Sequence, residues 1–244
     1  MNLHVSVLPV LVLALIHFFG GRLKFLGGTP RSIWLSMAGG VSVAYIFLHL
    51  FPELSEGQEQ VAKVIEAIGF LDNHVYLMAL VGLALFYGLE RAALTSRHSQ
   101  AEKGKGKEPS TGIFWLHISS FAIYNALIGY LLFQREEGTL QQLILFSVAM
   151  ALHFIINDFG LQEHYHQDYR HKGRWVLVIA LLVGWSIGLG LELQEATLAL
   201  VMAFIGGGVI LNVLKEELPE ERQSRYWAFI LGAGAYALLL LALQ

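Results

Sequence analysis

Eight apolar stretches, each about as long as a lipid bilayer is thick, dominate this sequence of 244 residues. A helix needs roughly 20 predominantly apolar residues to cross the hydrocarbon layer of a membrane. The stretches cover residues 3–20, 31–52, 72–90, 112–134, 139–160, 174–192, 195–217 and 225–243. The sequence therefore predicts an all-α polytopic membrane protein with eight transmembrane helices, which together form a single domain over residues 1–244.

The composition supports this class of fold and excludes several functions. Hydrophobic residues make up 55% of the chain and charged residues only 14%, whereas a soluble domain carries about a quarter charged residues. The chain has no cysteine, which excludes disulfides and thiolate metal sites. A net charge of -3 offers no basic surface for nucleic acid. We therefore expect membrane lipids, and no nucleic acid, among the partners.

The distribution of basic residues predicts the orientation, because cytoplasmic loops collect Lys and Arg. When the loops are assigned alternately to two sides, only Lys63 and Arg135 of the 16 basic residues fall on one side. The other side is then cytoplasmic, and both termini of this integral multi-pass protein lie on the non-cytoplasmic side. The longest hydrophilic segment, residues 91–111, is predicted to be a flexible cytoplasmic loop.

A weak internal repeat relates the second and seventh apolar stretches. At an offset of 167 residues, Gly39–Gly40 aligns with Gly206–Gly207. At the same offset, Pro52–Glu53 aligns with Pro219–Glu220. Because these two stretches run in opposite directions, stretches 1–3 and 6–8 would form an inverted repeat around stretches 4 and 5, as in many transporters. The alternative is that Pro-Glu marks two helix ends that meet water.

Polar residues in the fourth and fifth stretches are the main functional candidates, since an ionisable group inside a membrane is costly unless it pairs or faces a cavity. The fifth stretch contains His153, Asn157 and Asp158. Their imidazole, amide and carboxylate groups are suitable ligands for a divalent cation. In the fourth stretch, His117 and Ser120 lie on one stripe of the predicted helix, at a depth that lets them approach His153.

Each candidate also has a purely structural interpretation. His117 can join two helices by a hydrogen bond, and His153 with Asp158 can form an interhelical clamp. Ser120 can bond back to its own helix. His164 belongs to a histidine cluster in an inner loop, where either solvation or weak metal collection would explain it.

These features resemble the ZIP family of zinc and iron transporters, in the eight helices, the outer termini and the long loop after the third helix. HLFPE at 49–53 resembles the end of the family's second helix, and KEELPE at 215–220 resembles the end of its seventh, with Glu216 in place of aspartate. Residues 153–160 are similar to the HExPHExG motif of its fifth helix.

The ligand positions of the motifs are only partly kept. His153 keeps the first ligand of the fifth-helix motif, Asn157 and Asp158 replace the later His and Glu, and Phe154 replaces the first Glu. A second register aligns residues 157–159 with the Gly-Asp-Phe that follows the motif and leaves no ligand in place. Residues 120–129 are similar to HNxxDGxAxG of the fourth helix, with Ser120 at the histidine. The resemblance implies at best one metal site in place of the family's two.

From the resemblance we expect gradient-driven transport of zinc, iron or manganese towards the cytoplasm, with the metal as substrate, no organic cofactor and no enzymatic activity. His49 and Glu53 would gather the ion outside. His153, Asn157 and Asp158, with His117 or Ser120, would hold it within the membrane. The inner residues would release it, and these are Glu216, Glu217, Glu220 and His164.

Two other functions stay open at this point. The chain could be a ZIP-shaped scaffold or metal sensor that transports nothing. A third hypothesis is an intramembrane metal hydrolase, which would need three ligands at one depth, whereas His49 and His153 are expected near opposite faces. A homodimer is compatible with each of these functions.

Overall fold

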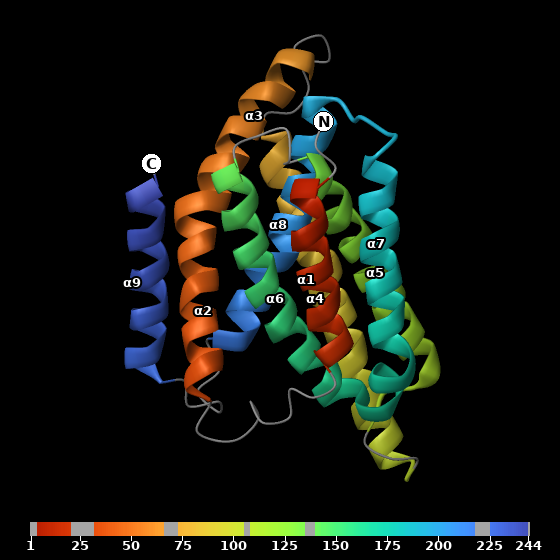
Figure 1. Cartoon of the computed structure of the whole chain (residues 1–244). Helices are drawn as coiled ribbons and strands as arrows, with labels where there is room; N and C mark the ends of the chain where they lie inside the picture. The colour runs from red at the N-terminus through yellow and green to blue at the C-terminus, as the bar shows by residue number, and fades with distance from the viewer. Residues whose placement is uncertain are drawn as a thin grey trace. The chain divides into compact units, whose positions relative to one another are not determined.

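The computed structural model describes residues 4–20, 32–65, 73–104, 108–134, 140–217 and 225–243, and these residues form helices and short connections (Figure 1). Two of the helical segments are π-helical, η2 (Ile46–Leu50) and η4 (Tyr169–Gly173). The α-helices are α1 (His4–Gly20), α2 (Ile33–Tyr45), α3 (Phe51–Ile65), α4 (His74–Glu102), α5 (Thr111–Gln134), α6 (Leu140–Asp168), α7 (Arg174–Gly188), α8 (Glu195–Glu217) and α9 (Tyr226–Leu243).

The helices fall where the apolar stretches predict them. Among the described residues, five helical stretches are long and apolar enough to cross a membrane: Ile33–Val64, His74–Glu102, Thr111–Gln134, Leu140–Gly188 and Glu195–Lys215. The segments Val5–Gly20 and Tyr226–Ala242 are also apolar but shorter. The described residues are thus helical, with several helices long and apolar enough to cross a membrane, while the count of eight spans stays a prediction.

Two predicted loops are helical over part of their length. The prediction of a loop over residues 91–111 is wrong up to Glu102, where α4 ends. The helix continues because this segment contains strong helix formers and because Ala93 is buried in the core. After the second stretch, the chain continues as α3 to Ile65. Pro52 has no backbone N–H, and the wider turn of η2 directly before it accommodates this missing donor.

By their internal contacts the residues divide into two compact units. Unit 1 comprises residues 1–27 and 87–191 and contains α1, the second part of α4, and α5 to α7. Unit 2 comprises residues 28–86 and 192–244 and contains α2, α3, the first part of α4, α8 and α9. The candidate residues divide between the units accordingly.

Unit 2 is built on two close helix crossings that glycine permits. Where α2 meets α9, a Cβ atom at Gly40 would overlap the carbonyl of Phe229, and one at Gly232 would overlap the carbonyl of Met37. The two helices run in the same direction (Figure 1). Each glycine therefore faces the carbonyl three residues before the other, which brings the two backbones into contact as in other membrane helix pairs.

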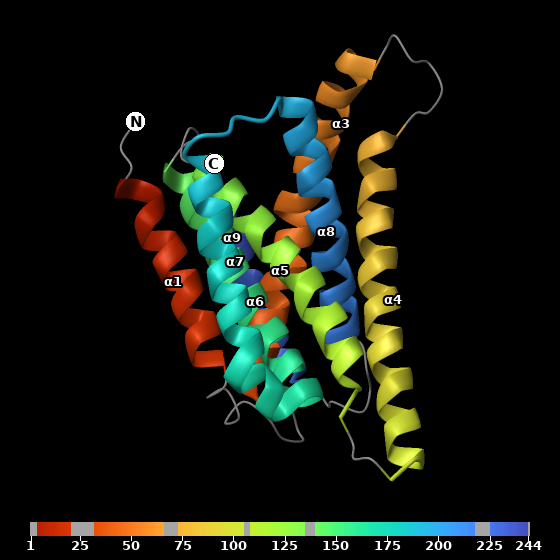
Figure 2. The same ribbon diagram turned by 90° about the vertical axis from the view of Figure 1, so that its right-hand side faces the viewer.

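The crossing of α4 and α8 repeats this geometry within unit 2, and these two helices also run in the same direction (Figure 2). A Cβ atom at Gly82 would overlap the carbonyl of Phe204, and one at Gly207 would overlap the carbonyl of Ala79. Gly207 is the residue that the offset of 167 pairs with Gly40. The two aligned glycines therefore make equivalent backbone contacts, each on a different helix pair.

Unit 1 contains a third crossing of the same kind, between α5 and α7. Gly129 faces the carbonyl of Leu181, and Gly184 faces the carbonyl of Ala126. On the other side of this pair, α1 packs against both α6 and α7. The helices α1, α5 and α6 thus lie within contact distance of one another, which allows polar side chains from three helices to meet.

Candidate functional site

Three buried polar side chains from three helices meet inside unit 1. His17 of α1 lies with Nδ1 at 2.8 Å and 3.0 Å from the two carboxylate oxygens of Asp158 on α6. Its other ring nitrogen, Nε2, lies 2.7 Å from Oδ1 of Asn125 on α5. All three residues are 0% exposed. We refer to His17, Asn125 and Asp158 as the central polar group.

The hydrogen bonds of the central polar group locate its protons. Asn125 Nδ2 donates to the backbone carbonyl of Phe121 at 2.8 Å, which fixes the amide so that Oδ1 faces His17. An amide oxygen only accepts, so His17 Nε2 must donate to it. A second proton lies between His17 Nδ1 and Asp158, because otherwise two lone pairs would face each other. The pair is therefore neutral overall, either as imidazolium and carboxylate or as imidazole and carboxylic acid.

The surroundings of Asp158 hold its carboxyl group in place. Gly20, at the end of α1, lies so close that a Cβ atom there would be 2.6 Å from Asp158 Oδ2. The buried phenol of Tyr169 interacts electrostatically with the same carboxyl group, without a well-aligned hydrogen bond. Arg174 donates to the backbone carbonyl of Phe18 at 3.0 Å, which secures the end of α1 beside this site.

Phe154 separates the central polar group from a second polar contact. Its ring centroid lies 4.3 Å from that of His17 and 6.2 Å from that of His153. His153 Nε2 is hydrogen-bonded to the Tyr124 hydroxyl at 3.1 Å. The Phe154 ring thus lies between the two histidines.

The structure brings the predicted midmembrane residues together only in part. Of His153, Asn157 and Asp158, all on α6 and all buried, Asp158 pairs with His17 and His153 pairs with Tyr124. Among the described residues, Asn157 Nδ2 has no hydrogen-bond partner. The metal site predicted for these residues stays a prediction, since their contacts show pairs and not a common cluster.

The two predicted residues of the fourth stretch have partners of their own. His117 Nδ1 and the Tyr165 hydroxyl are hydrogen-bonded at 2.7 Å, which joins α5 to α6. Ser120 donates to the backbone carbonyl of Leu116 at 2.9 Å and is half-buried. The structural interpretation of both residues, an interhelical bond and a bond within the helix, therefore describes their observed contacts.

Of the predicted outer and inner candidates, His49 and Glu53 lie on either side of the junction of η2 and α3, and His164 lies in the last turns of α6. In unit 2, His49 in η2 and Glu53 in α3 approach each other to 4.0 Å. In unit 1, His164 Nε2 donates to Glu90 Oε1 at 3.0 Å, which ties α6 to α4. Glu216 and Glu217 end α8, but their side chains, like Glu220, lie outside the described part of the structure.

Sequence reasoning did not select His17, Asn125 or Glu90 as site residues. The signal for His17 was present, since it is an ionisable residue within an apolar stretch, LALIHFFG. It was overlooked because the other polar residue on that helix face, Ser6, lies three turns away. Glu90 lies at the end of its predicted stretch, where a carboxylate is expected to reach water.

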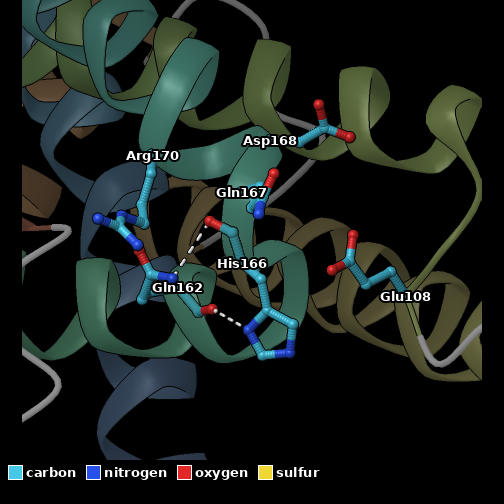
Figure 3. A pocket seen from close by; sticks show the side chains of 6 residues that line it. All are labelled: Glu108, Gln162, His166, Gln167, Asp168 and Arg170. Atoms are coloured by element: carbon cyan, nitrogen blue, oxygen red, sulfur yellow. Dashed lines mark hydrogen bonds between the residues drawn. The ribbon is translucent and has the colours of Figure 1, made fainter.

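A polar pocket of about 540 Å³ opens in unit 1 near the end of α6 (Figure 3). It lies where α6 is interrupted at His166, whose backbone has φ 36° and ψ −101°. Its lining combines acidic, basic and amide side chains. Its lining residues are Glu108, Gln162, His166, Gln167, Asp168 and Arg170.

Neither the central polar group nor this pocket encloses a metal by conventional ligands. Within the described ranges, no three His, Cys, Asp or Glu side chains are arranged to hold a metal ion. No known family model and no curated protein matches the sequence. The chemistry of the described side chains is therefore the basis for a function.

Proposed function

We propose that this protein carries a divalent metal ion, zinc, iron or manganese, across a membrane towards the cytoplasm, driven by the gradient of the ion. The observation that carries this proposal is the central polar group, a fully buried His17, Asn125 and Asp158 contributed by three apolar helices. An ionisable pair inside a membrane bundle is expensive, and such pairs commonly mark the path of an ion.

The donor atoms of the central polar group suit such a substrate. Once the proton between His17 Nδ1 and Asp158 is released to water, that ring nitrogen and the carboxylate are ligands for borderline or hard divalent cations, while His17 Nε2 keeps its hydrogen bond to Asn125. His17 Nδ1 already lies within 3.0 Å of both carboxylate oxygens. Asp158 would therefore be the principal ligand, with His153 and Asn157 next to it on α6 as further contacts.

The helix packing supports a transporter architecture for the same proposal. Gly40 and Gly207, aligned at an offset of 167, make equivalent contacts in helices that run in opposite directions. Equivalent positions in opposite directions are what an inverted repeat requires. We accordingly propose eight spans, two inverted halves of the ZIP kind, and both termini on the non-cytoplasmic side.

The ends of the path follow from the same orientation. His49 and Glu53 would attract the ion on the outer side, where the nearby acidic residues of α3 raise its local concentration. On the inner side, His164, Glu216, Glu217 and Glu220 would receive it. These assignments rest on the predicted orientation and on the side-chain chemistry.

Metal uptake by purified protein in lipid vesicles tests the proposal. Asp158→Asn and His17→Gln should each slow uptake of the transported ion at least tenfold, equivalent to about 1.4 kcal/mol. Glu163→Gln is the matched control, because Glu163 is an exposed acid on the same helix. Wild-type protein that moves none of zinc, iron and manganese would overturn the proposal, as would an Asp158→Asn variant as fast as the control.

A second function, a membrane scaffold or sensor without transport, is favoured by one observation. The buried histidines of unit 1 are tied in pairs to other helices, His17 to Asp158, His117 to Tyr165 and His153 to Tyr124. Pairs of this kind can serve only to join helices. Metal binding without uptake by the wild type would favour a sensor, and the absence of both would favour a scaffold.

A further inference from the structure

The pocket near the end of α6 is lined by a buried amide oxygen that accepts no hydrogen bond from the described residues. Gln162 is only 5% exposed, and its Oε1 has no hydrogen-bond partner among the described residues. Its Nε2 donates to the backbone carbonyl of His166 at 3.2 Å, so the amide is held with Oε1 as the remaining atom (Figure 3). A buried acceptor without a donor destabilises the protein, and a water molecule or a cation would offset this cost.

His166 presents a second acceptor to the pocket. Its Nδ1 donates to the backbone carbonyl of Gln162 at 3.0 Å (Figure 3). In the neutral ring this bond places the proton on Nδ1 and leaves a lone pair on Nε2. The carboxylates of Glu108 and Asp168 add further acceptors to the same lining.

A polar stripe connects this pocket to the central polar group. Asp158, Gln162 and His166 follow one another at steps of four residues along α6, which places the first two on one face of the helix. One such step advances about 6 Å along the axis. Gln162 is thus the next polar side chain after Asp158 in the direction of the pocket.

We propose that this pocket is the release vestibule of the carrier, where a divalent cation leaving Asp158 passes Gln162 Oε1 and regains its water shell. The inference rests on the proposed function and adds the inner exit of its path. A water molecule occupies about 30 Å³ in the liquid, so a volume of about 540 Å³ holds a hydrated ion.

The charges of the pocket suit release more than storage. Asp168 forms an ion pair with Lys172 at 2.9 Å, which partly neutralises its charge. Glu108 is therefore the pocket carboxylate whose charge would act more strongly on a cation. Arg170, exposed on the same lining, opposes a cation. A chamber with both signs of charge admits a cation without binding it tightly.

Cysteine labelling tests whether Gln162 faces a water-filled path, since the chain has no cysteine of its own. A thiol introduced by Gln162→Cys should react with a membrane-impermeant methanethiosulfonate from the cytoplasmic side only, and Mn²⁺ should slow the reaction. Leu161→Cys is the control, because Leu161 is buried in an apolar cluster at the adjacent position. We expect the Gln162→Cys thiol to react at least tenfold faster than the control. Equal reaction rates of the two thiols, or labelling of Gln162→Cys from both sides, would contradict the proposal of a vestibule.

Opposite charge changes provide a second measurement that does not depend on the cysteine variant folding. For Mn²⁺ supplied on the cytoplasmic side of vesicles, Glu108→Gln should raise the KM about threefold and Arg170→Gln should lower it about threefold, as expected for a charge several ångströms from the ion. A purely structural role would not shift the two variants in opposite directions. KM shifts of the same sign in both variants, or no shift in either, would contradict the proposal of a vestibule.

The two proposals fail in distinguishable ways. Wild-type protein that transports no metal contradicts the carrier, and the vestibule with it. Intact Mn²⁺ transport combined with an unreactive Gln162→Cys thiol and unchanged KM values contradicts the vestibule alone.

Discussion

Among single residues, Asp158 has the most constrained surroundings in unit 1. His17 faces both of its carboxylate oxygens, and the glycine at position 20 lies against them with no room for a side chain. The carboxyl group is fully buried in an apolar bundle. Its energetic role can therefore be measured through its neighbours as well as by its own replacement.

Replacing one partner of the buried pair should cost more than replacing both. His17→Leu leaves the Asp158 carboxyl buried without its main partner, and breaking a buried pair in this way costs about 3–5 kcal/mol. The double variant His17→Leu, Asp158→Leu should be considerably more stable than that single variant, because no uncompensated polar group remains. Unfolding in mixed micelles with increasing dodecyl sulfate measures both. Equal destabilisation by the single and double variants would contradict the pairing.

Gly20 offers a test that leaves both members of the pair in place. Gly20→Ala would put a methyl group 2.6 Å from Asp158 Oδ2 and 3.1 Å from its Cβ. Overpacking of this kind typically costs about 1–3 kcal/mol, and the same denaturation measures it. Gly112→Ala is the control, since a Cβ atom there meets nothing within 4 Å. If the two variants were equally stable, the close approach of α1 to Asp158 would be wrong.

At the scale of helices, reciprocal glycine contacts define the closest crossings in each unit. The pairs are α2 with α9, α4 with α8 and α5 with α7, and in each a glycine faces the carbonyl three residues before the partner glycine. In a membrane, where apolar surface gives little net attraction between helices, such close backbone packing is a main source of association.

Two glycines of α9 allow a matched comparison of this packing. Gly232→Ala would place a methyl group against the Met37 carbonyl, whereas a Cβ atom at Gly234 meets nothing within 4 Å. We expect Gly232→Ala to destabilise the protein by about 1–3 kcal/mol. Gly234→Ala should be neutral or slightly stabilising, because alanine favours a helix over glycine by about 1 kcal/mol. Thermal unfolding in detergent, followed by circular dichroism, distinguishes the two, and a reversed order would contradict the crossing of α2 and α9.

For the whole molecule, the tryptophans agree with the orientation that the basic residues predict. Four of the five lie within the first turns of helices that the prediction directs outward, and all four are exposed: Trp34, Trp115, Trp175 and Trp227. Tryptophan is enriched at both boundaries between a membrane and water, so these helix starts mark such a boundary. The distribution of basic residues predicts that it is the cytoplasmic one.

Labelling of single cysteines tests this orientation directly. Glu59 on α3 and His98 on α4 are both exposed and helical. In intact cells, Glu59→Cys should react with an impermeant maleimide added outside. His98→Cys should react only after the membrane is opened. The opposite result would reverse the topology and the direction of the proposed transport, and equal labelling of both from outside would contradict the topology altogether.

The sequence by itself determined the helical class and the positions of most helices, because a run of apolar residues long enough to cross a bilayer has few alternatives to a helix. It also identified Asp158 and His153 as buried polar residues of α6. It could not show that α4 continues to Glu102 or that α2 leads into α3, since helix ends at a membrane surface depend on weak propensities and on packing.

Only the tertiary structure decided which polar groups meet. His17 and Asp158 are 141 residues apart, and His17 and Asn125 are 108 apart. No spacing along the chain relates them, because helical periodicity orders side chains only within one helix. Their contact depends on how α1, α5 and α6 pack, and it gives Asp158 a partner that the sequence did not indicate. The physical reason is that a buried carboxyl group must find its hydrogen-bond partner wherever packing brings one within reach.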